Sequence, residues 1–259
     1  MKSVYTGGEK VAEFESYDEF RVGDGKPAFI YEGNDLVYPN PVKDGLVLWY
    51  DFSGRTNADG QRGIAEDLSG NGNHGTLQNF NFTPESGYDK NKLLFDGVDD
   101  RITAPPSGFG EDDFTMEIVL SSEGYMSFYT IFAKADRVSA IYNENAFGLT
   151  YIANPKYPFL IYYADGVRQL VRVGLDEEFP PSHIVMKKEG LNVSVYINGV
   201  KTVDNTHESI ETSEVASKSV RISENAWTTV GSVKAYNRPL TPEEIAHNYA
   251  IEKERFGIE

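Results

Sequence analysis

The chain has 259 residues, and its 24 Lys and Arg against 40 Asp and Glu give a formal net charge of −16. It contains no cysteine, which excludes disulfide frameworks, cysteine–zinc centres and cysteine nucleophiles. An acidic surface of this size repels phosphate backbones and anionic headgroups, so nucleic-acid and membrane-surface roles are disfavoured. The length suits one large domain with an appendage.

Residues 1–42 contain short extended runs separated by Gly-, Asn- and Asp-containing turns, a pattern that predicts β-hairpins. Pro39 and Pro41 cannot continue a strand ladder and mark a boundary. Such a segment has too little core to stand alone, so we expect it to dock on the main domain or on a partner protein. The candidate docking residues are Tyr31, Leu36 and Tyr38. No apolar stretch suits a signal peptide, so we expect the chain to fold in the cytoplasm.

Residues 43–259 have the pattern of an antiparallel β-sandwich, with short aromatic-rich strands and frequent Gly, Asn, Asp and Pro between them. Thr115 and Glu117 alternate with apolar neighbours, which is the period of a strand with one polar face. The pair Asn198-Gly199 predicts a type I′ hairpin turn. Trp49 lies in the middle of an apolar strand and is expected in the core.

One helix is predicted, at the C-terminal end of the chain, over about residues 242–255. Thr241 and Glu244 form a capping box, with Pro242 at the first helical position. Gly257 is the expected stop. The apolar face, Ile245, Tyr249 and either Ile251 or Phe256, is sufficient to dock the helix on a sandwich but not to build a helical domain.

Five segments resemble, in order, the landmarks of LamG-like, concanavalin A-like jelly-roll domains. They are GLVLWYDF at 45–52, DLSGNGNHGTL at 67–77, LFDGVDD at 94–100, VYING at 195–199 and VKAYNRPLTPEEI at 233–245. The resemblance implies an all-β jelly roll of two antiparallel sheets with a glycan-binding or adhesive role. The YNRPLTPEEI segment and the helix after it are similar to the version carried by bacteriophage and prophage structural proteins. Residues 30–38, IYEGNDLVY, resemble short β-repeats at the start of phage tail and baseplate proteins.

The glycine- and asparagine-rich loop at 67–75 has two interpretations. It can be a turn whose Asp67 and Ser69 accept from the loop's own amides. It can also be a calcium site, since the resemblance implies calcium near this loop and hard oxygen ligands are abundant. The candidate ligands are Asp67, Asn71, Asn73 and Asp96, with Asp99 and Asp100 close by in sequence. Many relatives carry an acidic pair where this chain has Gly231-Ser232, so calcium stays an alternative and no cofactor is required.

His74 lies in the same loop, and we expect it to satisfy a hydrogen bond. The four histidines are far apart in sequence and have no metal-ligand spacing, so a zinc enzyme is disfavoured.

The jelly roll also hosts glycanases, which need two carboxyls at matched positions. Glu208, Glu211 and Glu214 are spaced by three, which places neighbouring carboxylates on opposite faces of a strand. No Glu-x-Asp-x-Glu, nucleophile elbow, phosphate loop or dinucleotide motif is present. We therefore predict that the chain is not an enzyme, with a cell-wall glycanase as the weakest alternative.

A sugar-binding site needs exposed aromatic rings with polar groups at their edges. The candidates, each beside glycine, asparagine, proline or another loop-forming residue, are Trp227, Tyr125, Tyr142, Tyr151 and Tyr157. 

The sequence therefore favours a structural protein of a bacteriophage virion, assembled in the host cytoplasm, in the tail, baseplate, neck or capsid decoration. Residues 1–42 would contact other virion proteins, and the jelly roll would bind host-surface polysaccharide, in a symmetric oligomer. The alternative is a purely architectural subunit that binds no sugar.

Overall fold

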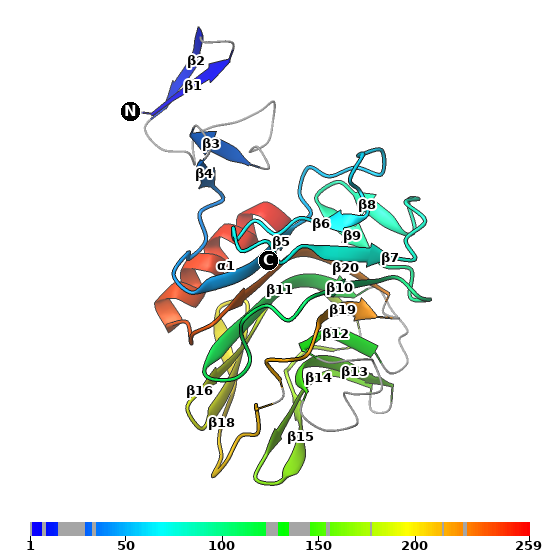
Figure 1. The fold of residues 1–259 in the computed structure, drawn as a ribbon, viewed down its shortest axis with the longest axis vertical. Helices are drawn as coiled ribbons and strands as arrows, with labels where there is room; N and C mark the ends of the chain where they lie inside the picture. The colour runs from blue at the N-terminus through cyan, green and yellow to red at the C-terminus, as the bar shows by residue number, and fades with distance from the viewer. Residues whose placement is uncertain are drawn as a thin grey trace. The chain divides into compact units, whose positions relative to one another are not determined.

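A computed structural model describes residues 2–6, 9–14, 29–32, 35–122, 129–134, 146–153, 156–176, 178–213, 215–224 and 227–259 (Figure 1). Contacts between residues divide the chain into two compact units, Met1–Pro41 and Val42–Glu259.

The described residues of the first unit form two antiparallel hairpins. Strand β1 (Lys2–Thr6) pairs with β2 (Glu9–Phe14), and β3 (Ile30–Glu32) pairs with β4 (Asp35–Tyr38). The prediction of hairpins at the start of the chain is confirmed.

The second unit is built from strands with one helix at its end. The strands of its first half are β5 (Leu46–Asp51), β6 (Ile64–Ala65), β7 (Gly75–Gln78), β8 (Gly87–Asp89), β9 (Lys92–Leu94), β10 (Arg101–Ala104), β11 (Phe114–Ser122) and β12 (Tyr129–Lys134). The later ones are β13 (Phe147–Ala153), β14 (Lys156–Ala164), β15 (Val167–Arg172), β16 (Phe179–Glu189), β17 (Asn192–Ile197), β18 (Val200–Thr206), β19 (Val220–Glu224) and β20 (Thr228–Tyr236).

These strands form two antiparallel sheets, each with eight strands among the described residues. One has the order β15-β14-β13-β12-β19-β10-β7-β6. The other has the order β18-β17-β16-β11-β20-β9-β8, with β5 also paired to β20. On one side of β20, the first part of the strand pairs with β9 and the later part with β5. The predicted jelly-roll sandwich is confirmed.

The core lies between the two sheets, where alternate residues of each strand meet. Leu149 and Ile102 from one sheet belong to the same buried cluster as Met116, Ile184 and Val233 from the other. Phe114 and Phe147 contact edge to face across this layer, with ring centroids 4.7 Å apart. Trp49, expected in the core, is fully buried.

The hairpin between β17 and β18 turns at Asn198 and Gly199, as predicted. Both residues have positive φ, 51° and 78°, and Ile197 pairs with Val200 across the turn. The Asn198 Oδ1 accepts a hydrogen bond from the His183 backbone N–H at 2.9 Å, which fastens the turn to β16.

Helix α1 (Pro242–Phe256) is the one helix among the described residues, and it has the predicted caps. The Thr241 side chain and Glu244 form the capping box, and Gly257 ends the helix at φ 65°. Figure 1 shows α1 alongside β5 and β11. No helix in the described part of the chain is long and apolar enough to cross a membrane.

The buried face of α1 is more polar than the predicted one. Its buried residues are Ile245, Asn248, Glu252 and Phe256. Glu252 makes an ion pair with Lys234 of β20, and both oxygens of Glu117 of β11 accept from the Asn248 amide at 3.0 and 3.1 Å. Because all four of these polar side chains are almost fully buried, the helix is fixed to the sheet by charge as well as by apolar packing.

Candidate functional site

Two segments far apart in sequence meet where β9 leads into β10. Residues 96–100, hereafter the 96–100 turn, connect these strands, and Trp227 directly precedes β20. The Phe95 N–H donates to the Thr228 carbonyl at 2.9 Å, which aligns the segments. Gly97 has a φ of 76°, and a Cβ built on it would lie 3.1 Å from the Trp227 Cβ. The turn and Trp227 are therefore in direct contact.

Two apolar side chains of this region, one large and one small, lie in solvent. Trp227 is 55% exposed, and Val98, the residue after Gly97, is 70% exposed. An exposed indole beside a small apolar side chain and carboxylates is the combination that binds the apolar face and the hydroxyls of a sugar ring.

The same turn carries a cluster of carboxylates. One oxygen from each of Asp96, Asp99 and Asp100 lies within 4.8 Å of the other two. Asp100 is 1% exposed, and its Oδ2 accepts from the Asp96 N–H at 3.0 Å. Its Oδ1 is buried and makes no hydrogen bond of ordinary geometry with the described residues, although the Ser86 hydroxyl lies close enough to the carboxyl to act on its pKa.

Burial raises the pKa of the Asp100 carboxyl to about 6, and the neighbouring Asp96 and Asp99 carboxylates add to this shift. The Asp96 amide and the nearby Ser86 hydroxyl act in the opposite direction.

The 67–75 loop is closed by its own hydrogen bonds. Asp67 Oδ1 accepts from the N–H groups of Trp49 and Ser69, at 2.9 and 3.0 Å. Its Oδ2 accepts from the Ser69 hydroxyl and the Asn73 N–H, both at 2.9 Å. With both oxygens already accepting two bonds, this carboxylate is committed to the turn. Asn71 and Asn73 donate their side-chain amides to the carbonyls of Leu46 and Val47.

The predicted calcium ligands are thus divided between two places. The described carboxylates that share one cluster are Asp96, Asp99 and Asp100, and Asp67 is not among them. The spacing in the sequence could have separated the residues of the 67–75 loop from those of the 96–100 turn. Three aspartates within five residues lie in one turn, whereas Asp67 is far from them in sequence.

His74 accepts the Asp67 N–H through Nδ1 at 3.1 Å, so it satisfies a hydrogen bond as expected. With Nδ1 as acceptor, the neutral ring carries its proton on Nε2. The ring lines a cavity of about 470 Å³ together with Arg55, Asp59, Gln61, Ile64 and Glu66.

Among the remaining aromatic candidates, Tyr157 is the one whose side chain belongs to the described structure. Tyr125 and Tyr142 lie outside the described residues. Tyr151 is on β13, and its side chain is not among those described. The Tyr157 ring faces the Arg172 guanidinium, 3.6 Å from the ring centroid, so that face of the ring is covered.

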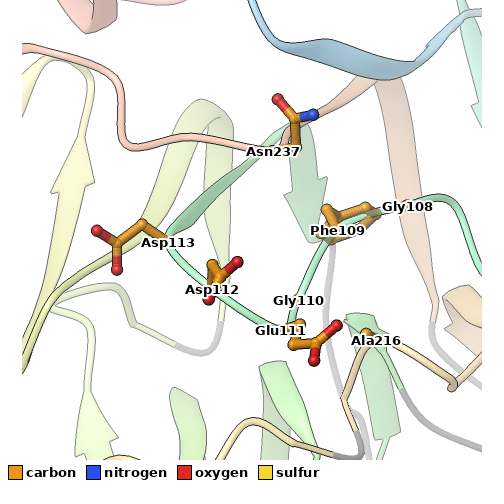
Figure 2. A pocket seen from close by; sticks show the side chains of 8 residues that line it. All are labelled: Gly108, Phe109, Gly110, Glu111, Asp112, Asp113, Ala216 and Asn237. Atoms are coloured by element: carbon orange, nitrogen blue, oxygen red, sulfur yellow. The ribbon is translucent and has the colours of Figure 1, made fainter.

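A second acidic region lines a cavity of about 270 Å³ formed by residues 108–113, Ala216 and Asn237. Figure 2 shows the side chains of Glu111, Asp112 and Asp113 pointing in different directions. Asp113 accepts from the Lys188 ammonium at 3.0 Å and from the Gly190 N–H at 2.7 Å. These three carboxylates do not converge on a point within the described structure.

Two of the three carboxylates considered for glycan hydrolysis, Glu208 and Glu211, belong to the described residues. Glu211 accepts from the Gly166 N–H and the Ser209 hydroxyl, at 3.3 and 3.2 Å. The Glu208 backbone N–H donates to Asp165. Glu214 lies outside the described residues.

Among the predicted docking residues, the Tyr31 side chain is 55% exposed and Tyr38 is buried. Leu36 lies on β4, with its side chain outside the described set.

Comparisons with solved structures identify the fold. The chain is similar to Trypanosoma rangeli sialidase in complex with 2,3-difluorosialic acid, with a TM-score of 0.58 and 18% identity, covering 83% of this chain and 34% of that one. It is also similar to domain 4 of AbnA, an extracellular GH43 arabinanase from Geobacillus stearothermophilus, in complex with arabinotriose. The TM-score is 0.58 and the identity 17%, over 79% of this chain and 98% of that one.

A third similar structure is the binding domain of Paraclostridial Mosquitocidal Protein 1, with a TM-score of 0.57 and 14% identity, over 80% of this chain and 52% of that one. The chain therefore spans about a third of the sialidase and nearly the whole of the arabinanase domain. No protein-family model matches the sequence. No curated protein matches it either.

These structures correct one prediction. The sequence was interpreted as that of a chain without enzyme activity, and this is contradicted by the sialidases among the similar folds. The missing carboxylate motif argues against one kind of glycanase site, but it does not separate this fold from that of glycosidases. At 18% identity, the similarity shows a shared jelly-roll fold and assigns no activity.

Proposed function

We propose that residues 42–259 bind carbohydrate through the surface formed by Trp227, Val98 and the 96–100 turn. The observation that carries this proposal is the exposed indole held in place by Gly97, with carboxylates beside it. The similar arabinanase domain, solved in complex with arabinotriose, supports the same class of ligand.

Substitution of the indole tests the proposal. The full chain should bind the cell-wall polysaccharide of a host bacterium saturably, and Trp227→Ala should weaken this binding by about tenfold or more. Leu191→Ala removes another exposed apolar side chain, 49% exposed, and should leave binding unchanged. Equal binding by Trp227→Ala and the parent chain would contradict the proposal. Release of reducing ends, measured on the same samples, would show that the chain also hydrolyses its ligand.

We also propose that the chain is a bacteriophage virion protein, attached to the particle through residues 1–42. The resemblance of residues 30–38 and 233–245 to phage structural proteins supports this role, and the exposed Tyr31 offers a contact. High copy number on a particle would strengthen weak sugar binding through avidity.

The virion role has its own test. Antibody against the chain should label purified particles of the phage that encodes it, and Tyr31→Ala should lower the number of copies per particle. Val200→Ala, at an exposed position in the other unit, is the control. Unlabelled particles would contradict the virion role. Labelled particles without cell binding would favour the architectural alternative.

A further inference from the structure

We propose that a polysaccharide bound at Trp227 continues across β20 into a groove lined by Lys92, Ser121 and the Pro180-Pro181 pair, so that the chain binds long oligosaccharides more tightly than short ones. The inference rests on the proposed function. It adds a second subsite to the Trp227 surface and a dependence of affinity on the length of the ligand.

The groove lies where β9, β11 and β16 come together, and its volume is about 430 Å³. Lys92 of β9 and Ser121 of β11 line it, together with Glu178, Pro180 and Pro181 at the start of β16. Three strands therefore contribute side chains to one concave surface of a size that suits a small ligand or one part of a longer one.

The register of β20 places this groove on the same face of the sheet as Trp227. Successive side chains of a strand point to opposite faces. Thr228 is 2% exposed, and its hydroxyl lies 2.6 Å from that of Ser223 on the other sheet, so it points into the sandwich. The exposed Trp227 and the half-buried Thr229, on either side of it, therefore share the outer face. Ser121 pairs directly with Thr229, so its side chain lies on that face too.

The separation between the indole and the groove suits a chain of sugars. From Trp227 to Thr229 the backbone advances about 7 Å, and the step from β20 to β11 adds about 5 Å across the sheet. Strand β16, which carries the proline pair, is paired with β11 and lies about another 5 Å further. One sugar ring packed on the indole does not reach the groove, whereas an oligosaccharide of several units covers both.

The polar groups of the groove are available to a ligand. The side chains of Lys92, Ser121 and Glu178 make no hydrogen bond or ion pair within the described part of the chain. The ammonium donates, the carboxylate accepts and the hydroxyl does both, so the three together match sugar hydroxyls in either sense. The rings of Pro180 and Pro181 add an apolar wall on which the C–H face of a sugar can pack.

Two subsites on one ligand have a measurable consequence. Once one end of an oligosaccharide is held at Trp227, the groove meets the other end at a high effective concentration, so even a weak second contact raises the affinity. Affinity should therefore increase with fragment length and level off when the fragment spans both subsites.

Fragments of graded length test the inference on the full chain. Partial hydrolysis of the cell-wall polysaccharide of a host bacterium supplies them, and calorimetry measures the affinity for each length. For the parent chain we expect a rise of about tenfold or more from the shortest fragments to those that reach the groove. A variant with both Lys92→Gln and Ser121→Ala should bind long fragments only as tightly as the parent chain binds short ones. Trp227→Ala should weaken binding at every length.

The matched control carries Lys90→Gln and Ser194→Ala. Lys90 lies two positions from Lys92 but outside the groove, and Ser194 is a buried serine of β17. This control should keep the full dependence on length, and near-ultraviolet circular dichroism checks that every variant is folded.

The failure of the groove and the failure of the proposed function give different results. Equal affinity at all lengths, or a groove variant that binds like the control, would overturn the inference and leave the Trp227 surface in place. Long fragments that bind Trp227→Ala as tightly as the parent chain, but bind the groove variant weakly, would uphold the groove and refute the Trp227 surface. Absence of binding at every length would refute the proposed function and the inference with it.

Discussion

Gly97 and Trp227 are in contact although 130 positions separate them, and the glycine's lack of a Cβ permits this approach. Its φ of 76° also favours glycine. The exposed surface around the indole therefore depends on a backbone position in another segment.

Gly97→Ala should lower the free energy of unfolding by more than its backbone strain alone. Positive φ costs alanine about 1–2 kcal/mol, and displacement of Trp227 adds about 1 kcal/mol. Gly108→Ala is the matched control, because Gly108 has a φ of 67° and its Cβ would meet nothing within 4 Å. Urea denaturation measures the free energy of unfolding of both variants and of the parent chain. Equal losses for the two variants would show that the contact with Trp227 has no energetic role.

Asp67→Ala should destabilise the second unit by about 3 kcal/mol, because it leaves four donors of the 67–75 loop and β5 without their acceptor. Urea denaturation measures the loss of stability. A variant as stable as the parent chain would show that these four hydrogen bonds do not hold the loop in place.

The charges under α1 should make the fold sensitive to acid. Burial alone would raise the pKa values of Glu117 and Glu252, but hydrogen bonds and opposite charge outweigh it. The interactions of Glu117 with His183, Lys234 and Asn248 lower its pKa, while Lys234 and Arg255 lower that of Glu252. A carboxylate with a lowered folded-state pKa stabilises the fold above its unfolded value, near 4.5, and the contribution is lost as pH falls through the folded value. Stability should therefore drop below about pH 4.5.

Glu252→Gln tests this account, because it leaves the buried Lys234 without its closest counter-charge. We expect a loss of about 3 kcal/mol at pH 7 and a shallower fall of stability in acid. Glu243→Gln, on the exposed first turn of α1, should change neither. A steep acid transition that persists unchanged in Glu252→Gln would assign the acid sensitivity to other groups.

Asn198 offers a test of the predicted turn. Asn198→Val must place a β-branched residue at φ 51° and also loses the bond to the His183 N–H, so it should cost about 2–3 kcal/mol. Asn198→Gly loses the hydrogen bond alone and should cost about 1 kcal/mol. Thermal unfolding measures the stability of the two variants. A larger loss in Asn198→Gly than in Asn198→Val would contradict the requirement for positive φ at this turn.

The features that could be predicted correctly from the sequence depend on interactions between residues close together in the chain. The caps of α1 and the turn at Asn198-Gly199 depend on neighbouring residues, and both are confirmed. The contact of Gly97 with Trp227 depends on strand pairing between β9 and β20, which no local pattern encodes.

Burial of charge was equally hidden from the sequence. From the sequence, Asn248 and Glu252 would be expected on the solvent-exposed face of the helix. In the structure they are buried, because Asn248 donates to Glu117 and Glu252 pairs with Lys234 on the sheet that the helix covers. Asp67 was a candidate ion ligand because the sequence does not show which groups donate to it. The fold shows that both of its carboxylate oxygens already accept hydrogen bonds from the protein.

The position of β20 has a consequence for how the chain folds during synthesis. Its hydrogen bonds join β5 and β9 on one side and β11 on the other. Strand β9 also pairs with β8, and β11 with β16, but the described pairing of β5 is with β20 alone, so β5 finds its partner only after residues 228–236 have emerged. Contacts of such high sequence separation slow folding, and β5 stays unpaired until nearly all strands of the sandwich have been synthesised. A ribosome stalled before residue 228 should therefore hold a nascent chain that chaperones and proteases recognise.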